Sequence, residues 1–149
     1  MEGVKMAELP KGRVLGIDAG TVRTGIAVSD ETGFLARAVC TVKAKGRREL
    51  VSKIVEQANE HSVRLIVMGH PINMNGTLGE SSERIMKLAD SIREQTDIPV
   101  VLFDERCTTM AAAQILNLTD TGGQKRKDII DALSAEIILQ NYLDSEKRK

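Results

Sequence analysis

The order of apolar segments constrains the fold of this chain more than any other feature. Three short apolar runs come first, over Arg13–Asp18, Gly25–Asp30 and Phe34–Val42, and short turns join them. Parallel neighbours need long crossover connections, so three closely spaced strands predict an antiparallel meander. Beyond residue 46 the apolar residues recur at helical spacing, and predicted helices then alternate with strands.

The second part of the chain supplies the helices and the remaining strands. The expected elements are a helix over Arg47–His61, a strand over Arg64–Gly69, a helix capped by Ser82, a strand over Val100–Asp104, a helix that begins near Thr108 or Thr109, and a final helix over Ile129–Leu143. This order predicts an α/β domain with a five-stranded mixed sheet, an antiparallel meander followed by β-α-β-α, and helices on both faces. It resembles the order of elements in the ribonuclease H-like fold. We expect a leader over residues 1–12, the domain over 13–144 and a charged tail over 145–149.

Composition excludes several classes of function. The 149 residues suffice for one domain, and an aromatic content of 2% argues against RNA recognition by stacked aromatic side chains. Lys and Arg total 21, as do Asp and Glu, so any attraction to nucleic acid must come from local clusters. Cys40 and Cys107 lack the paired spacing of a disulfide framework or a zinc site. No apolar run reaches the ~18 residues of a membrane span, and we expect a cytoplasmic protein.

Acidic residues stand at the ends of apolar segments. Asp18 ends the first predicted strand, Asp104 and Glu105 end the last one, and Asp131 lies early in the final helix. The carboxyl ends of parallel strands share one edge of a sheet, so these carboxylates are expected to converge. Converging carboxylates repel one another unless cations neutralise them, and oxygen ligands suit Mg²⁺ or Mn²⁺. Two such ions would clamp the attacking water and the leaving oxygen of a phosphodiester. Taken singly, each acid is more typical of a helix cap, a strand-end carboxylate or a surface salt bridge, and only their convergence favours a site.

Polar residues near these acids are candidate contacts to nucleic acid. The basic ones, predicted to bind phosphate, are Arg23, Arg106, Lys125, Arg126 and Lys127. The long segment Gly69–Gly79 begins at a strand end, as functional loops often do, and its Asn73 and Asn75 are candidates for a phosphate or a base edge. His70 is more typical of a surface residue than of a proton carrier.

Four blocks of the chain resemble the YqgF/RuvX family, a branch of the ribonuclease H-like superfamily related to Holliday-junction resolvases. The blocks are Gly16–Asp30, Gly69–Gly79, Asp104–Thr109 and Arg126–Leu143, and they follow the family's order. The resemblance implies a nuclease that matures the 5′ end of the small-subunit ribosomal RNA precursor; older descriptions imply a Holliday-junction resolvase. The family's acids match Asp18, Glu105 and Asp131, with Asp104 beside them. Adjacent strand residues face opposite sides, so only one of Asp104 and Glu105 should line the site, and Glu105 is favoured. The chain departs from the family at Val22, Cys107 and Met110.

Three interpretations of function remain distinct at this level. The preferred one is a metal-dependent nuclease acting on structured RNA, such as precursor rRNA or a ribosomal particle, as a monomer or a homodimer. The same site in a symmetric dimer would suit a DNA junction instead. A non-catalytic nucleic-acid-binding or transcription-associated protein would keep the fold without the chemistry. The segment Asp18–Thr21 also resembles the phosphate loop of actin- and sugar-kinase-like ATPases, but those proteins need two such domains.

Overall fold

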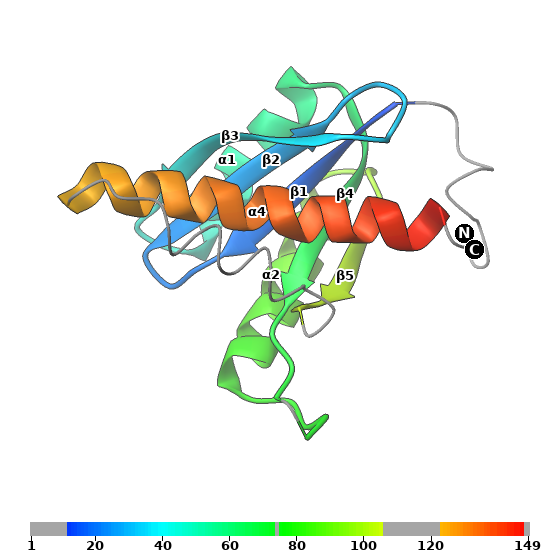
Figure 1. Ribbon diagram of the computed structural model, residues 1–149. Helices are drawn as coiled ribbons and strands as arrows, with labels where there is room; N and C mark the ends of the chain where they lie inside the picture. Colours follow the sequence, from blue (N-terminus) through cyan, green and yellow to red (C-terminus); the bar gives the residue numbers. More distant parts are fainter. Residues whose placement is uncertain (1–11, 74, 106–122, 148–149) are drawn as a thin grey trace.

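The computed structural model describes residues 12–73, 75–105 and 123–147, the last range by its backbone alone as far as residue 128. Its centre is one five-stranded sheet with helices on both faces (Figure 1). The predicted architecture is therefore confirmed. None of the helices in the described ranges is both long and apolar enough to cross a membrane.

The sheet is mixed, and its meander comes first along the chain. The strands are β1 (Arg13–Ala19), β2 (Arg23–Ser29), β3 (Ala36–Lys43), β4 (Val63–His70) and β5 (Val100–Asp104). They lie in the order β3-β2-β1-β4-β5. β2 pairs antiparallel with both β1 and β3, whereas β4 runs parallel to β1 and β5 runs parallel to β4. The carboxyl ends of β1, β4 and β5 therefore share one edge of the sheet.

The helices divide between the two faces of this sheet. α1 (Arg47–Glu60) and α2 (Glu80–Gln95) pack together against one face. Among the described residues, α4 (Gly123–Lys147) covers the other face, and it contacts β1, β2 and β3 (Figure 1). Every strand side chain thus points either toward α1 and α2 or toward α4, and strand alternation decides which.

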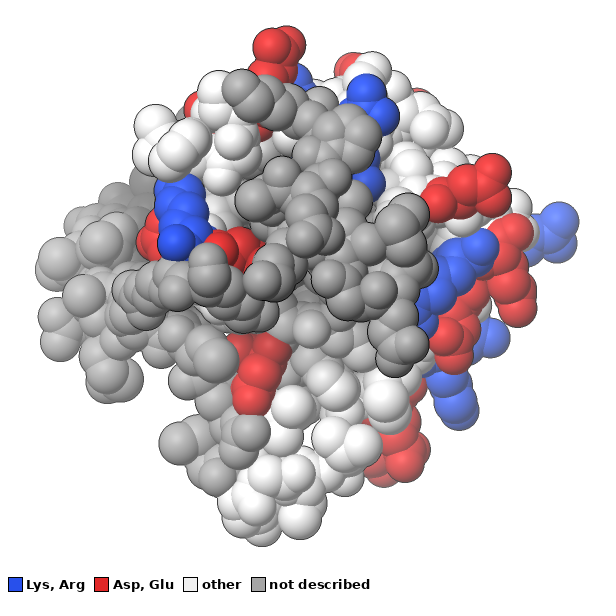
Figure 2. Space-filling view, turned by 90° about the vertical axis from the view of Figure 1, so that its right-hand side faces the viewer, with Lys and Arg blue, Asp and Glu red and all other residues white. Residues whose placement is uncertain are grey.

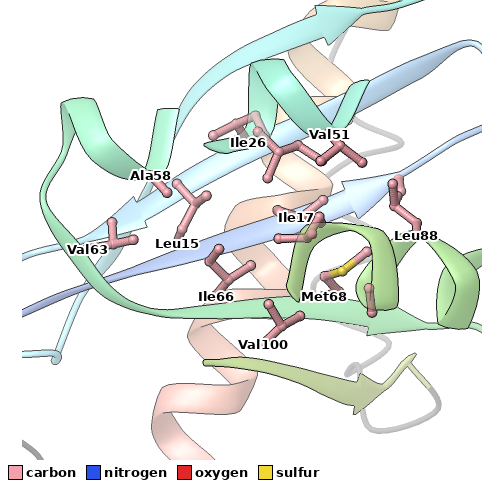
Figure 3. Packing of buried hydrophobic residues seen from close by; sticks show 14 of the residues in the cluster. Leu15, Ile17, Ile26, Val51, Ala58, Val63, Ile66, Met68, Leu88 and Val100 are labelled. Carbon is pink, nitrogen blue, oxygen red and sulfur yellow. The ribbon is translucent and has the colours of Figure 1, made fainter. Parts of the chain in front are cut away.

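The larger hydrophobic core lies between the sheet and the pair α1–α2. Leu15 and Ile17 of β1 point into it beside Ile26 of β2, and Ile66 and Met68 of β4 complete its floor (Figure 3). All five are fully buried. Burying side chains of this size stabilises the fold by roughly 1.5–3 kcal/mol each, before the entropy of ordering them is subtracted.

The opposite face is built for close contact with α4. Ala135, Leu139 and Leu143 of the helix pack on strand residues Val14, Ala27, Leu65 and Val67. A Cβ placed on Gly16 would lie 2.7 Å from the Cβ of Leu139, so only glycine lets the helix come this near. α4 also covers the outer edge of β3: the Ala38 amide donates to Glu136 Oε1 (2.8 Å) and the Ala36 amide to Gln140 Oε1 (2.9 Å).

Two helices begin at other residues than the sequence predicts. α4 begins at Gly123 instead of Ile129, so Lys125–Lys127, expected in a loop, belong to the helix. Gln, Lys and Arg are good helix formers, and one glycine at the first position does not prevent a helix. α2 begins at Glu80 after Gly79, and Ser82 is a buried residue within it, not its cap. The helix expected from Thr108 or Thr109 lies outside the described residues.

Candidate functional site

Asp18 lies on the α4 face of the sheet. Val14 packs into the core beneath α4 and Gly16 touches that helix, so Asp18 is the next residue on the same side of β1. Its neighbours Ile17 and Ala19 point into the opposite core. The apolar run that made this acid conspicuous in the sequence therefore places it at a partly buried position, one residue before β1 ends.

Glu105 follows β5 on the same face. Phe103 packs beneath α4 and pairs with Gly69 of β4. A Cβ on Gly69 would collide with the Glu105 carboxylate and would lie 2.7 Å from Ile138 Cδ1, so the carboxylate lies directly over this glycine. Asp104 is instead the register partner of His70, whose Nε2 lies 2.5 Å from Ser82 Oγ on α2. The two adjacent acids therefore occupy opposite faces.

Asp131 reaches the same face from α4. Its backbone crosses β2 at Gly25, where a Cβ would overlap the Asp131 carbonyl oxygen. Gly25 is the register partner of Asp18, so the helix passes Asp131 within one strand of that acid. The Asp131 carboxylate accepts a hydrogen bond from Arg23 Nε at 2.6 Å, and both side chains are about a quarter exposed, 22% and 24% respectively.

The carboxylates influence one another electrostatically. Burial, followed by repulsion from Asp131, raises the pKa of Asp18 to about 6, although the positive charge of Arg84 opposes the shift. Burial, followed by repulsion from Asp18 and then Asp104, raises the pKa of Glu105 to about 7. Asp18 thus takes part in both repulsions: Asp131 raises the pKa of Asp18, and Asp18 raises the pKa of Glu105. The protein alone leaves negative charge here incompletely compensated.

Arg84 of α2 takes part in this arrangement, and the sequence gives no sign of it. Its Nη2 donates to the Ala19 carbonyl (3.2 Å) and its Nη1 to the Gly20 carbonyl (3.3 Å). The turn after β1 is closed by the Gly20 amide, which donates to the Arg23 carbonyl at 2.9 Å. Arg84 therefore holds the turn that follows Asp18. In the sequence it is one polar position of an amphipathic helix, with no spacing that relates it to β1.

The predicted nucleic-acid contacts are placed unevenly. Arg23 is at the site but pairs with Asp131. Asn73 and Asn75 are exposed at the tip of the Gly69–Gly79 loop. Their side chains bind within it: Asn73 Nδ2 donates to Thr77 Oγ1 (3.0 Å), and Thr77 Oγ1 donates to Asn75 Oδ1 (2.7 Å). Arg106 lies outside the described residues, and so do the side chains of Lys125, Arg126 and Lys127. Figure 2 shows one side of the molecule, where described Lys, Arg, Asp and Glu residues are interspersed without one sign dominating.

The donor set fits a hard divalent cation by its chemistry. Asp18, Glu105 and Asp131 offer carboxylate oxygens, the ligands that Mg²⁺ and Mn²⁺ prefer. A cation between Asp18 and Glu105 would offset the repulsion and burial that raise both pKa values. The described side chains do not, however, include three or more His, Cys, Asp or Glu residues grouped closely enough to hold one ion. The acids form two interacting pairs that share Asp18.

Known proteins resemble this chain over nearly its full length. A protein of Thermoanaerobacter pseudethanolicus named "Putative pre-16S rRNA nuclease" is 41% identical over 92% of this chain and 99% of its own length. A protein of the same name from Clostridioides difficile is 43% identical over 89% of this chain and 94% of its own.

The fold is shared with a solved structure of distant sequence. The structure of T. thermophilus RuvC in complex with a Holliday-junction substrate superposes with a TM-score of 0.56 at 13% identity, covering 92% of this chain and 96% of that one. The resemblance to a ribonuclease H-like resolvase fold is thus confirmed. The model of the RuvX family, described as Holliday junction resolvase, matches residues 12–145. The chain is therefore a member of the RuvX family of nucleases.

Proposed function

We propose that this protein is a metal-dependent nuclease that hydrolyses phosphodiester bonds in structured RNA, with the precursor of 16S ribosomal RNA as its substrate. The observation that carries the proposal is that Asp18, Glu105 and Asp131 come from three separate elements to the α4 face, where Asp18 interacts electrostatically with each of the other two. The names of relatives about 40% identical over most of the chain support the substrate.

Asp18, Glu105 and Asp131 would hold Mg²⁺ or Mn²⁺, with Asp18 as the shared ligand. Such ions, when bound, supply an activated water and stabilise the negative charge of the departing oxygen. The protein's own contribution is positional. Gly25 and Gly69 bring α4 and the Glu105 side chain close to the sheet, and Arg84 fixes the turn after Asp18.

Arg23 holds Asp131 in the described arrangement. The Arg23 guanidinium orients the Asp131 carboxylate, so this ligand would not have to be ordered when a metal ion binds. We assign Arg23 this positioning role in addition to the phosphate contact expected from the sequence. Arg23 would keep its positive charge in both roles, because the guanidinium that orients Asp131 would also lie near the bound phosphate.

A DNA junction is the second candidate substrate, and the family description favours it. Resolution of a four-way junction needs two sites presented by a symmetric dimer. The two substrates are separable in one assay: an end-labelled ribosomal precursor RNA and a four-way DNA junction are incubated with Mg²⁺, Mn²⁺ or EDTA.

We expect RNA cleavage with either metal and none with EDTA, and no cleavage by Asp18→Asn or Asp131→Asn. The exposed Asp97→Asn is the matched control and should cleave as the unchanged protein does. Cleavage of the junction alone, by a dimer, would instead assign DNA. Intact RNA binding with no cleavage of either substrate would contradict the nuclease and favour a binding protein.

A further inference from the structure

A hollow of about 420 Å³ lies at the sheet edge on the side of α1 and α2, next to the turn that follows Asp18. Its walls are the β1–β2 turn, the segment leading into α1, and the first half of α2. We propose that this hollow, called here the turn pocket, binds a phosphate group of the same nucleic-acid strand that is cut at the acids. This inference rests on the proposed nuclease function and adds a second point of contact with the substrate.

The charges lining the turn pocket favour an anion. Lys45, Arg47, Arg84 and Lys87 line it, against the two carboxylates of Glu80 and Glu83. Lys45, Arg47 and Lys87 are exposed. Within the described part of the chain, none of the four cations forms an ion pair with a carboxylate within 4.0 Å. In a chain of net charge zero, this is a local excess of positive charge, the kind of cluster that phosphate binding requires.

One residue, Arg84, connects the turn pocket to the turn that follows Asp18. Arg84 lines the pocket and also donates to the carbonyls of Ala19 and Gly20, directly after Asp18. Among the described residues, the β1–β2 turn lies between the two places, since Asp18 faces α4 and the pocket is lined by α2. A strand held at Asp18 and Glu105 would cross the sheet edge over this turn to reach the pocket.

The surface of the turn suits such a crossing. Thr21 and Val22 are exposed, Val22 by 66%, and both line the pocket. Val22 presents an apolar surface to a sugar or a base, while the cations behind it receive the phosphate. Contacts of this kind fix the register of a strand without reading its sequence.

The test compares two double variants that remove equal charge. Lys45→Gln/Lys87→Gln acts in the pocket. Arg37→Gln/Arg64→Gln acts on exposed cations near the starts of β3 and β4, at the opposite end of the sheet. Binding of a labelled single-stranded 12-nucleotide RNA is measured by fluorescence anisotropy at several salt concentrations. All variants carry Asp18→Asn, so that the probe stays uncut.

We expect the pocket pair to weaken binding about tenfold at low salt. The slope of log affinity against log salt should become shallower by about 0.7 for each phosphate group that the protein no longer neutralises. The Arg37/Arg64 pair should stay within about twofold, and Lys45→Arg/Lys87→Arg should retain binding. Equal decreases in affinity from both neutral pairs would overturn the proposal, because net charge alone would then account for them.

Two further measurements complete the test. The first asks whether the pocket binds a free nucleotide instead of a nucleic-acid strand, and the second separates the pocket proposal from the nuclease proposal. Competition with ATP or pyrophosphate tests a free phosphate compound: micromolar displacement that the pocket pair abolishes would replace the strand by a nucleotide. Cleavage by the protein with an intact Asp18 is measured in parallel. A pocket effect on binding without any cleavage supports the pocket and contradicts the nuclease. Cleavage with no pocket effect contradicts the pocket alone.

Discussion

Replacing Gly25 with Ala tests how closely α4 must approach the sheet. The added Cβ would overlap the Asp131 carbonyl oxygen and would lie 3.1 Å from the Ala132 amide nitrogen, where ordinary contact begins at 3.4 Å. Both obstacles belong to the helix backbone, which no side-chain rotation can move. The helix must therefore retreat as a unit, and the packing of Leu139 and Ala135 on the strands loosens with it.

The expected cost is about 3 kcal/mol of unfolding free energy, the upper end of the ~1–3 kcal/mol typical of overpacking, because backbone meets backbone. That is a large fraction of the ~5–15 kcal/mol that stabilises a domain. Function should suffer more than stability. A retreat of α4 would lengthen the Arg23–Asp131 hydrogen bond, which is 2.6 Å long, and would move Asp131 away from Asp18.

Urea unfolding followed by far-ultraviolet circular dichroism measures the stability, and initial cleavage rates measure the function. Gly46→Ala is the control: a Cβ there meets nothing within 4 Å and its φ of 179° suits any residue, so its cost should be limited to the ~1 kcal/mol by which glycine is preferred over alanine before the first turn of a helix. If Gly25→Ala loses less than about 1 kcal/mol and cleaves at the unchanged rate, α4 does not sit as tightly as described, and the reasoning fails.

Three other perturbations give separate outcomes. Because burial and repulsion raise the pKa of Asp18 from 3.8 to about 6, its ionisation destabilises the fold as pH rises from about 4 to beyond 6. Asp18→Asn should therefore gain roughly 3 kcal/mol of unfolding free energy at pH 8 without metal and almost nothing at pH 4. Urea unfolding at both pH values checks this, and Asp97→Asn should leave the stability unchanged. Mg²⁺ at millimolar concentration should raise the Tm of the unchanged protein at pH 8 and fail to raise that of Asp18→Asn; equal shifts in both would remove Asp18 from the ligands. Ser82→Ala should cost about 1–2 kcal/mol of unfolding free energy, because it removes the hydrogen bond between the buried Ser82 hydroxyl and His70. Cleavage should stay within twofold of the unchanged protein. A large loss of cleavage would instead indicate that His70, which faces α2, takes part in the reaction.

The sequence was most informative where periodicity and burial coincide. The meander and the five strands follow from short apolar runs such as Arg13–Asp18. Side chains alternate between the two faces of a strand, and this alternation also places Asp104 and Glu105 on opposite faces. An acid inside an apolar run is conspicuous because burial penalises it, which is why Asp18 and Asp131 stand out in the amino-acid sequence itself.

Other parts of the site depend on distance in space and leave no local pattern. Arg84 meets the Ala19 carbonyl across 65 positions of sequence. Gly25 and Gly69 read as ordinary strand glycines, although each makes room for one of the candidate acids. The start of α4 was misplaced because glycine and a run of charge suggest a loop. The helix instead extends back to Gly123 from the part of α4 that packs on the sheet through Ala135, Leu139 and Leu143.

The contacts between α4 and β3 have a consequence for solubility. Glu136 and Gln140 accept the Ala38 and Ala36 amides of the outermost strand, so the helix acts as a shield over a row of groups that another molecule could otherwise use for strand pairing. The same helix carries Asp131. A change that loosens it to alter catalysis would also uncover this edge, and self-association would follow. Changes at the candidate site on α4 are thereby coupled to the solubility of the protein.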